Sequence, residues 1–355
     1  MTNLEQMPSP LLAWFDENKR ILPWRENTAP YRVWVSEIML QQTRVEAVKP
    51  YFERFMKALP TLRDLADVDE EKLLKLWEGL GYYNRARNLQ KAARCVVEQY
   101  DGQMPGDYEK LLSLPGIGSY TAGAIASISF QICEPAVDGN VLRVLSRMTC
   151  SGEDILSQKV KKHWEEVLRE LMPQGRPGDF NQAMMELGAT VCVPNGAPHC
   201  EECPVGELCR AYAEGRQLEF PYKKSKKERR VEEKTILIIR DGDRTVLHKR
   251  ENTGLLAGMY EFPSLAGYVC AQDVVRYLEN VGYRVLHIKE LEKAKHIFSH
   301  VEWQMKGYAV KVEENGFSDR TLAQTEGHIL VHPDETKEAY PIPSAFRAYT
   351  HYVNI

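Results

Sequence analysis

The sequence has no apolar run that approaches the roughly 18 residues a helix needs to span a membrane. Its first ten residues, MTNLEQMPSP, lack the basic stretch followed by an apolar one that marks a secretory signal. Positive charge is also scarce, since 46 Lys and Arg face 50 Asp and Glu and the net charge is −4. We therefore expect a cytoplasmic globular protein without membrane contacts. Bulk positive charge is excluded as a means of binding nucleic acid, so any such binding must use local features.

Disulfides are not expected either, because cysteines in a cytoplasmic chain are more typical of thiols or metal ligands. Four of the eight cysteines are scattered, whereas Cys192, Cys200, Cys203 and Cys209 lie within 18 residues. Four thiolates in one loop predict a soft metal, either zinc or an iron–sulfur cluster. Zinc sites usually pair two Cys-x2-Cys knuckles, and this loop has only one, so the spacing favours a [4Fe–4S] cluster. His199 is an alternative ligand.

Strand-like alternation is absent from residues 1–222, which we predict to form an all-α domain. One helix is predicted to run from Tyr31 to Leu59, and another is predicted to be capped by Asp179. Residues 223–230, KKSKKERR, carry six basic residues against one acid and read as a solvated basic linker. Runs rich in β-branched residues then predict a smaller α+β domain over residues 231–355. The length of 355 residues suits two or three domains.

A glycine turn between two helical patterns stands at Leu114–Gly118, Leu-Pro-Gly-Ile-Gly. Gly116 and Gly118 can take positive φ and expose their N–H groups where the next helix begins. The positive end of that helix faces the same point, which is typical of a phosphate-binding turn. The alternative is an ordinary Pro-Gly turn between helices. An isolated Asp138 follows in Val-Asp-Gly-Asn.

A single acid, Glu37, lies within the apolar stretch Val-Trp-Val-Ser-Glu-Ile-Met-Leu. A carboxyl group in such a place loses solvation and holds its proton more tightly, which suits a general acid at neutral pH. Gln42 and Thr43 add uncharged hydrogen-bonding groups within about a turn of it. The alternative is a glutamate on the exposed face of its helix.

Two glycines flank Leu80 in the stretch Gly-Leu-Gly-Tyr-Tyr, and Tyr82 follows. We expect Leu80 and Tyr82 to be exposed, with Arg85 and Arg87 behind them. An apolar loop backed by arginines is what insertion between DNA bases requires. The alternative is a glycine helix cap whose aromatic residues fold into the core.

These motifs occur in a fixed order: Glu37 in Ser-Glu-Ile-Met-Leu-Gln-Gln-Thr, the Leu-Pro-Gly-Ile-Gly turn, Val-Asp-Gly-Asn and the four-cysteine loop. In this order they resemble the adenine DNA glycosylases of the MutY type, within the helix-hairpin-helix superfamily of endonuclease III. Tyr120 stands where the lyase relatives carry the lysine that forms a Schiff base. The first cysteine gap is seven residues where that family usually has six, a one-residue insertion that a loop absorbs easily.

The resemblance implies the removal of adenine from double-stranded DNA in base excision repair, where adenine lies opposite 8-oxoguanine or guanine. Glu37 would protonate N7 of a flipped adenine, Asp138 would stabilise the sugar cation, Asn140 would orient Asp138 or the sugar, and Tyr120 would line the site. The family also implies six further binding residues, four around adenine and two that fill the gap it leaves: Leu22, Trp24, Arg25 and Gln182, then Gln42 and Tyr82. The implied cofactor is a [4Fe–4S] cluster, and we expect a monomer associated with the nucleoid.

The C-terminal domain resembles the Nudix fold but lacks its metal-binding carboxylates, of which only Glu279 remains near Gly282. Without carboxylates to hold magnesium we interpret it as a binding module. In the resembling family it recognises 8-oxoguanine through a hairpin with Phe-Ser-His, matched here by Phe298, Ser299 and His300.

Two other functions remain open. A bifunctional pyrimidine-lesion glycosylase shares the helical domain, and Tyr120 argues against it. The second is a non-catalytic protein that uses the cluster to bind damaged DNA or to sense redox state. The pair Glu37 and Asp138 argues against this second function.

Overall fold

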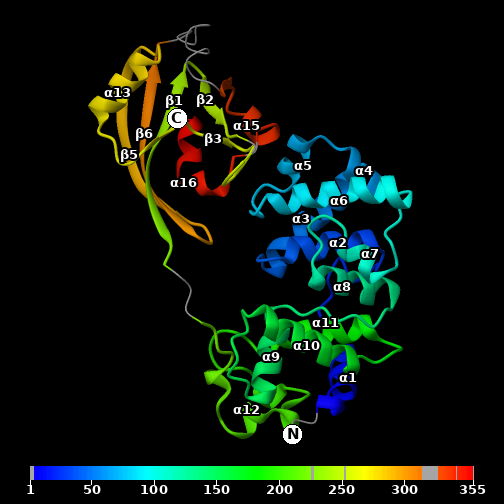
Figure 1. Cartoon of the computed structure of the whole chain (residues 1–355). Coiled ribbons are helices and arrows are strands. Elements are labelled where there is room, and N and C mark those ends of the chain that lie inside the picture. The colour runs from blue at the N-terminus through cyan, green and yellow to red at the C-terminus, as the bar shows by residue number, and fades with distance from the viewer. Residues whose placement is uncertain (1–3, 225–227, 252, 314–326, 341, 355) are drawn as a thin grey trace. The chain divides into compact units, whose positions relative to one another are not determined.

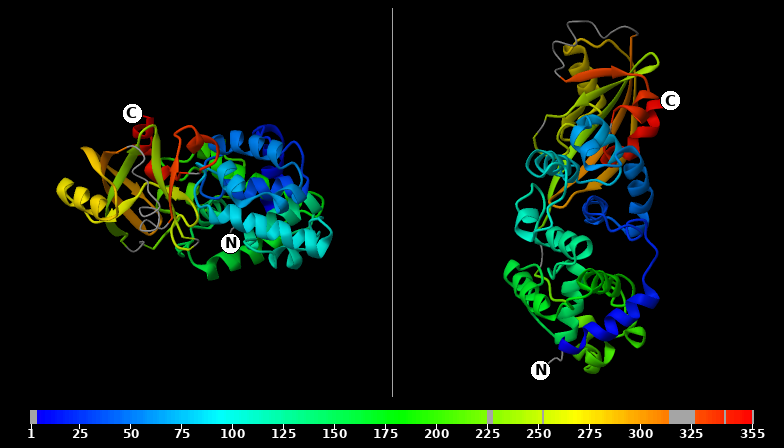
Figure 2. Two further views of the ribbon diagram at one scale, coloured as in Figure 1. Left: turned by 90° about the horizontal axis from the view of Figure 1, so that it is seen from above. Right: turned by 90° about the vertical axis from the view of Figure 1, so that its right-hand side faces the viewer.

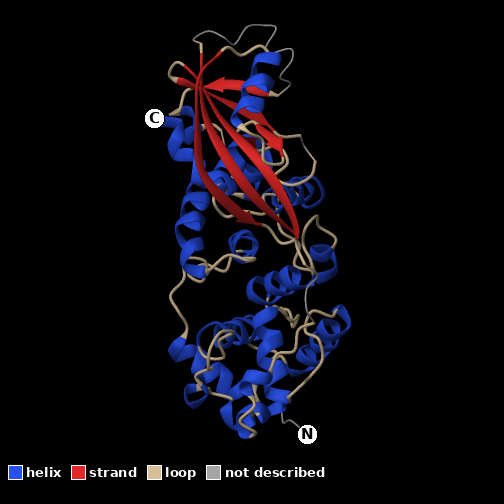
Figure 3. Ribbon diagram, turned by 90° about the vertical axis from the view of Figure 1, so that its left-hand side faces the viewer, coloured by secondary structure: helices blue, strands red, loops and turns tan. Residues whose placement is uncertain are grey.

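The computed structural model describes residues 4–224, 228–251, 253–313, 327–340 and 342–354, and it divides into two compact units. Unit 1 comprises Met1–Asp67 and Arg87–Ser225, and unit 2 comprises Val68–Ala86 and Lys226–Ile355. Residues 68–86, predicted within the helical domain, thus group with the C-terminal residues. All strands of the described residues lie in unit 2 (Figure 3). In these described ranges no helix combines the length and the apolar character needed to cross a membrane.

Unit 1 is built from helices. Their bounds are α1 (Pro8–Asn18), α2 (Pro30–Leu40), α3 (Val45–Ala58), α4 (Leu62–Asp67), α6 (Asn84–Tyr100), α7 (Tyr108–Leu112), α8 (Ser119–Phe130), α9 (Gly139–Thr149), α10 (Gln158–Leu171), α11 (Pro177–Thr190) and α12 (Arg210–Ala213). Helix α6 begins in the part of the chain that groups with unit 2. Helix α11 begins at Pro177 and not after Asp179 as predicted, because proline suits the first turn of a helix.

The helix predicted from Tyr31 to Leu59 is two helices, and the prediction of one continuous element was wrong. Gln42 adopts φ 59°, a left-handed conformation that a helix cannot continue through. Helix α2 ends before it at Leu40 and α3 begins after it at Val45. Apolar periodicity on both sides of the break hid it from the sequence pattern.

The N-terminal helix closes the core of the C-terminal half of unit 1. Met7, the N-cap of α1, and Leu11 and Phe15 within it are fully buried or nearly so, in one cluster with apolar residues of α9, α10 and α11. Figures 1 and 2 show α1 beside these later helices. Helix α8 is buried along most of its length, and at Gly123 a Cβ would lie 2.2 Å from the carbonyl oxygen of Pro135. Only glycine permits that close approach.

Unit 2 contains a mixed sheet of order β3-β2-β1-β6-β5, in which β1 pairs with β6 in parallel and β5 with β6 antiparallel. Strand β4 pairs with β1, and β7 pairs with β2. The strand bounds are β1 (Arg230–Asp241), β2 (Arg244–Lys249), β3 (Tyr260–Glu261), β4 (Ser264–Ala266), β5 (Val285–Ile297), β6 (Val301–Val312) and β7 (His328–Val331). The helices of this unit are α5 (Glu70–Leu76), α13 (Ala271–Asn280), α15 (Glu335–Glu338) and α16 (Arg347–Thr350).

Alternation along β1 separates two cores, one on each face of the sheet. Ile236 and Ile238 pack with Phe346 and the residues around α16, whereas Leu237 and Ile239 pack against α13. Figure 1 shows α13 and α16 on opposite faces. A strand whose side chains are apolar on both faces is typical of a covered sheet, which explains the continuous apolar run Ile-Leu-Ile-Ile.

Candidate active site

Glu37 lies on α2, a helix buried along nearly its whole length, and its exposure is 6%. The phenol of Tyr120 donates a hydrogen bond of 2.5 Å to its Oε2. The pKa of Glu37 is raised to about 7, mainly by burial, and the nearby Asp138 carboxylate contributes to the rise, whereas the Tyr120 hydrogen bond and Arg25 act in the opposite direction. A carboxyl group with this pKa carries a proton through much of the neutral range and can donate it.

Tyr120 is the second residue of α8, directly after the glycine turn, so the turn places the phenol beside Glu37. Its hydroxyl also lies 3.6 Å from the Sδ of Met185 on α11. Burial first, and then the charges of Glu37 and Asp138, raise the pKa of Tyr120 well above its usual value. The phenol therefore stays protonated and acts as a hydrogen-bond donor to Glu37.

Asp138 is the N-cap of α9, which explains why an isolated aspartate precedes Gly-Asn in the sequence. Its Oδ1 accepts from the backbone N–H groups of Asn140 at 2.9 Å and Val141 at 2.8 Å, and its Oδ2 accepts from the Asn140 side-chain amide at 2.7 Å. Burial raises the pKa of Asp138, and these three hydrogen bonds and Arg143 oppose that rise. Donors aimed at both oxygens favour the ionised carboxylate.

Asn140 is held in turn by Arg143, one turn along α9. The Arg143 guanidinium donates to the Asn140 Oδ1 at 2.9 Å and to the carbonyl oxygens of Gly188 at 2.7 Å and Cys192 at 2.9 Å. Helices α9 and α11 can approach this closely because residue 188 is glycine: a Cβ there would lie 2.6 Å from the Asn140 Cβ. The sequence reasoning missed Arg143, although its i+3 spacing from Asn140 was a usable signal.

The binding residues predicted around adenine come from two segments of unit 1. Leu22 and Trp24 are buried, at 2% and 7% exposure, in the segment before α2. Arg25 from the same segment donates through Nε to the Gln182 Oε1 at 3.1 Å, so these two predicted residues are brought together. Arg25 also acts electrostatically on Glu37, and its positive charge lowers the pKa of that acid.

Glu186 was missed by the sequence reasoning. Its side chain is only 1% exposed, and it pairs with Arg20 at 2.6 Å and Arg25 at 2.9 Å. Its position four residues after Gln182 puts both on one face of α11, which is the signal that could have found it.

Two of the residues predicted to contact DNA adopt left-handed backbone conformations that are rare outside glycine. Gln42 has φ 59° and is exposed, and Tyr82 has φ 48° and is 49% exposed. Such strained positions cluster at functional sites. Thr43 follows Gln42 in the break between α2 and α3, where its hydroxyl lies 3.4 Å from the Gln41 carbonyl.

The glycine turn exposes both of its glycines, but only one behaves as predicted. Gly116 has φ +75°, and a Cβ there would lie 2.6 Å from the Asn88 Cβ. Gly118 has φ −97° as the extended N-cap of α8, so the expectation of positive φ at this position was wrong. The turn needs only one left-handed residue to reverse the chain before α8.

Leu80 is buried, at 7% exposure, and the expectation that it is exposed was wrong. The loop folds back on itself, because Trp77 Nε1 donates to the Gly81 carbonyl at 3.2 Å and Arg85 Nη2 donates to the Leu80 carbonyl at 3.0 Å. These bonds turn Leu80 inward and leave Tyr82 at the surface.

Tyr82 and Ser299 belong to the same unit, and their hydroxyl oxygens are 2.8 Å apart. Ser299 lies with Phe298 and His300 in the turn between β5 and β6. The Phe298 ring packs edge-on against Trp303, with centroids 4.8 Å apart, and also against His296, with centroids 4.6 Å apart. The turn is thus fixed by aromatic contacts while Ser299 reaches Tyr82.

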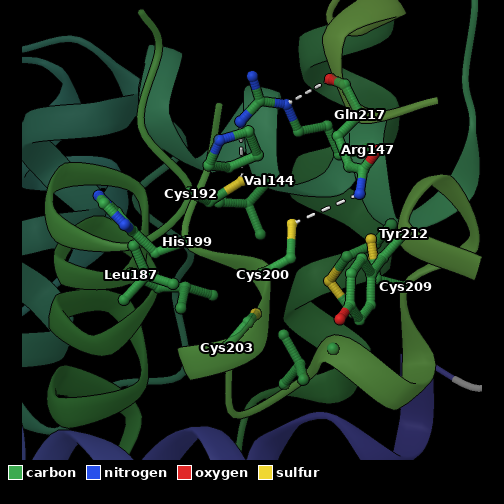
Figure 4. A pocket seen from close by; sticks show the side chains of 15 residues that line it. Val144, Arg147, Leu187, Cys192, His199, Cys200, Cys203, Cys209, Tyr212 and Gln217 are labelled. Carbon is green, nitrogen blue, oxygen red and sulfur yellow. Dashed lines mark hydrogen bonds between the residues drawn. The ribbon is translucent and has the colours of Figure 1, made fainter. Parts of the chain in front are cut away.

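The four clustered cysteines line one pocket between α9, α11 and the loop that follows (Figure 4). Arg147 of α9 contacts the Cys192 sulfur at 3.2 Å, and Gln217 contacts the Cys200 sulfur at 3.8 Å. Cys203 and Cys209 complete the lining, and His199 lies at the same pocket. Within the described residues, no three His, Cys, Asp or Glu side chains are arranged to hold a single metal ion.

Two family models match this chain, one in the helical region and one in the strand-containing region. A family model described as HhH-GPD superfamily base excision DNA repair protein matches residues 35–170, and a NUDIX domain model matches residues 235–352. The chain is similar to the structure of a thermostable thymine-DNA glycosylase, with TM-score 0.55 and 29% sequence identity. The matched region covers 60% of this chain and 99% of the glycosylase. It is also similar to the structure of a non-covalent endonuclease III–DNA complex, with TM-score 0.52 and 25% identity. That match covers 61% of this chain and 99% of the endonuclease III chain.

Curated relatives extend the likeness over most of the chain. The adenine DNA glycosylase of Rattus norvegicus is 38% identical over 370 residues, which cover 88% of this chain and 72% of the relative. The adenine DNA glycosylase of Buchnera aphidicola subsp. Baizongia pistaciae is 34% identical over 295 residues, which cover 82% of each. This identity and coverage show that the chain belongs to the adenine DNA glycosylase family, within the helix-hairpin-helix superfamily.

Proposed function

We propose that the protein removes adenine from DNA by hydrolysis of the N-glycosidic bond, with Glu37 as general acid and Asp138 as the stabiliser of the sugar cation. The family is that of DNA N-glycosylases acting in base excision repair. The observation that carries the proposal is the buried Glu37 carboxyl group with its pKa raised to about 7, beside Tyr120 and Asp138.

Cleavage of a purine N-glycosidic bond needs a proton on the leaving base and relief of the positive charge on the sugar. Glu37 supplies the proton to N7 of a flipped adenine, because it is still partly protonated at neutral pH. Tyr120 holds the carboxyl group in place and stabilises the carboxylate left after transfer, since its phenol donates to Oε2.

Asp138 takes the opposite role because its surroundings differ. It accepts three hydrogen bonds at the start of α9, where the helix dipole also favours negative charge. A carboxylate held in this way stabilises the oxocarbenium ion, or attacks it as in retaining glycosidases. Asn140 orients Asp138 through its side-chain amide.

Tyr120 occupies the position where lyase relatives carry their lysine, so this site has no amine for a Schiff base. A phenol with a strongly raised pKa is a poor nucleophile. We therefore propose a monofunctional enzyme that leaves an abasic site.

The opposite base is proposed to be 8-oxoguanine or guanine, read by the β5–β6 turn. Phe298, Ser299 and His300 form that turn, and Tyr82, proposed to fill the gap left by adenine, already contacts Ser299 at 2.8 Å. Reading the opposite base and filling the gap would thus be linked by one hydrogen bond. We further propose that the chain acts as a monomer in the cytoplasm, on chromosomal DNA.

The cysteine pocket is proposed to hold a [4Fe–4S] cluster, and the donor set fits. Thiolates around one tetrahedral zinc lie about 4 Å apart, given zinc–sulfur bonds of about 2.3 Å. Four thiols that line a single pocket provide the all-cysteine donor set by which iron–sulfur clusters are held. Cys192, Cys200, Cys203 and Cys209 would hold it, and the bound cluster would cross-link their loop. Iron and sulfide analysis of the purified chain tests this, with four of each expected per chain.

A single-turnover assay on a duplex with adenine opposite 8-oxoguanine tests the function. We expect free adenine and an abasic strand that breaks only after alkali treatment. Asp138→Asn should retain duplex binding and lose most of the cleavage; substantial residual cleavage would remove Asp138 from the mechanism. Trapping of an enzyme–DNA adduct by borohydride would favour a bifunctional enzyme, and an absence of cleavage would favour a binding protein.

A further inference from the structure

Glu186 is a buried carboxylate to which the mechanism above gives no role. Oε1 accepts from the backbone N–H of Arg20 at 3.1 Å and from its Nε at 2.6 Å, and Oε2 accepts from Arg20 Nη2 at 3.0 Å and from Arg25 Nη2 at 2.9 Å. Burial alone would raise its pKa, but the bonds to Arg20 and Arg25 hold the pKa of Glu186 below its usual value. It is therefore a permanent negative charge in the interior, which persists only because it is paired.

Arg25 is held on three sides. Nη2 donates to Glu186, Nη1 donates to the Arg20 carbonyl at 3.0 Å, and Nε donates to the Gln182 Oε1 at 3.1 Å. A guanidinium only donates hydrogen bonds, so the amide oxygen of Gln182 must face Arg25. The amide nitrogen of Gln182 has no protein partner among the described residues and is left for another acceptor. The rotamer of Gln182 thus depends on Arg25, and the rotamer of Arg25 depends on Glu186.

Arg25 also acts electrostatically on the general acid. The charged and titratable groups that act on Glu37 are Tyr120 from α8, Asp138 at the N-terminus of α9, and Arg25 from the segment before α2. Arg25 is the only cation among these three, and Glu186 is its direct counter-charge. A change at Glu186 therefore reaches Glu37 through Arg25 without any contact between the two glutamates.

We propose that Glu186 is a positioning residue that holds Arg25 so as to fix Gln182 at the adenine site and to limit the positive field on Glu37. The inference rests on the proposed function, since it assigns Glu37 as the acid and Gln182 to the adenine site. It adds a residue that acts on the site through Arg25.

Two variants of the full-length protein, Glu186→Gln and Arg20→Gln, change the local charge in opposite directions. Glu186→Gln leaves Arg25 unbalanced, which favours ionised Glu37 and moves the alkaline limb of the rate–pH profile to lower pH. Arg20→Gln leaves Glu186 in excess over its remaining partner and moves that limb to higher pH. The shift of the alkaline limb should be on the order of half a pH unit or more for Glu186→Gln. It should be smaller for Arg20→Gln, because the Arg20 side chain is 34% exposed and solvent screens its charge.

The experiment measures single-turnover cleavage between pH 5 and 9 on a duplex with adenine opposite 8-oxoguanine, with thermal melting at each pH. Opposite shifts of the two profiles support the inference. Unmoved profiles, or shifts of the same sign, overturn it and leave Glu186 a purely structural ion pair. If Glu186→Gln fails to fold, the direction of the Arg20→Gln shift decides. The proposed function fails separately, when the unmodified protein does not release adenine or has no alkaline limb.

Discussion

The Tyr120 phenol donates a hydrogen bond to the Glu37 carboxylate across 83 positions of sequence. The tyrosine stands at the first turn of a helix that follows a glycine turn, and the acid stands in the middle of another buried helix. The glycine turn is proposed to bind DNA, and Glu37 is proposed to protonate the base. The hydrogen bond between Tyr120 and Glu37 connects these two parts of the site. Five predictions follow from the site and from unit 2.

Glu37→Gln should keep duplex binding and lower the single-turnover rate by roughly 10²–10⁴-fold, the usual contribution of a general acid. The amide fills the same space and cannot give up a proton at neutral pH. Cleavage is measured by release of the labelled base and binding by gel shift on a non-cleavable duplex. Glu53→Gln, at an exposed position of α3, is the matched control and should behave as the unmodified protein. Near-normal cleavage by Glu37→Gln would remove the general-acid role.

The same substitution should change stability with a definite sign. The pKa of Glu37 rises from 4.5 to about 7 on folding, so its contribution is fully present below pH 4.5 and is lost as pH rises through 7. Glu37→Gln does not titrate and so avoids this loss. Relative to the unmodified protein, its free energy of unfolding should therefore be higher at pH 8 than at pH 4, by up to about 3 kcal/mol. Urea unfolding at the two pH values measures it. An equal effect of Glu37→Gln at both would contradict the raised pKa.

Tyr120→Phe should move the alkaline limb of the rate–pH profile upward. The hydrogen bond from Tyr120 stabilises ionised Glu37, so its loss raises the pKa of the acid further. The variant should be slower at pH 6, where the carboxyl group is less well held, and relatively less impaired at pH 8. A profile that moves downward would show that the phenol does not donate to Glu37.

Gly188→Ala should impair catalysis from a position that touches no substrate. Its new Cβ would lie 2.6 Å from the Asn140 Cβ, and the resulting shift disturbs the hydrogen bond from Asn140 to Asp138. We expect at least a tenfold loss of single-turnover rate and a destabilisation of about 1–3 kcal/mol, as for other overpacked contacts. Gly152→Ala has open space around its Cβ and serves as the control. Equal rates for the two variants would show that Asn140 does not position Asp138.

Joint substitution of Phe298→Ala and Ser299→Ala should reduce the preference for adenine opposite 8-oxoguanine over adenine opposite guanine. Phe298 fixes the turn against Trp303, and Ser299 carries the polar group that Tyr82 contacts. The ratio of the two single-turnover rates is the measurement. Leu286→Ala, at an exposed position near the start of β5, is the control. An unaltered ratio would exclude the turn as the reader of the opposite base.

The sequence by itself determined the features that are local in the chain. The apolar surroundings of Glu37 predicted its burial, since a helix without a polar face must be covered on all sides. The residues of the glycine turn predicted the reversal of the chain before α8, and the cysteine spacing predicted that four thiols would meet. Each of these depends on residues only a few positions apart.

The sequence pattern failed where a single backbone angle decided the outcome. Gln42 breaks a continuous apolar periodicity with φ 59°, and periodicity carries no information about one left-handed residue. Leu80 was expected outside because two glycines flank it, but hydrogen bonds from Trp77 and Arg85 fold its loop inward. Strand β5 begins at Val285, and the exposed charged residues of its first half give no clear alternation that would mark it in the sequence.

Only the tertiary structure decided which distant residues act together. Asp138 caps its own helix whatever the fold, yet its influence on the pKa of Glu37 exists only because α2, α8 and α9 meet. The pairing of Glu186 with Arg20 and Arg25 joins residues more than 160 positions apart, and the hydrogen bond from Arg25 to Gln182 spans 157. Such contacts depend on helix packing, which no local pattern encodes. The chain therefore specifies its chemical groups locally and their roles through the fold.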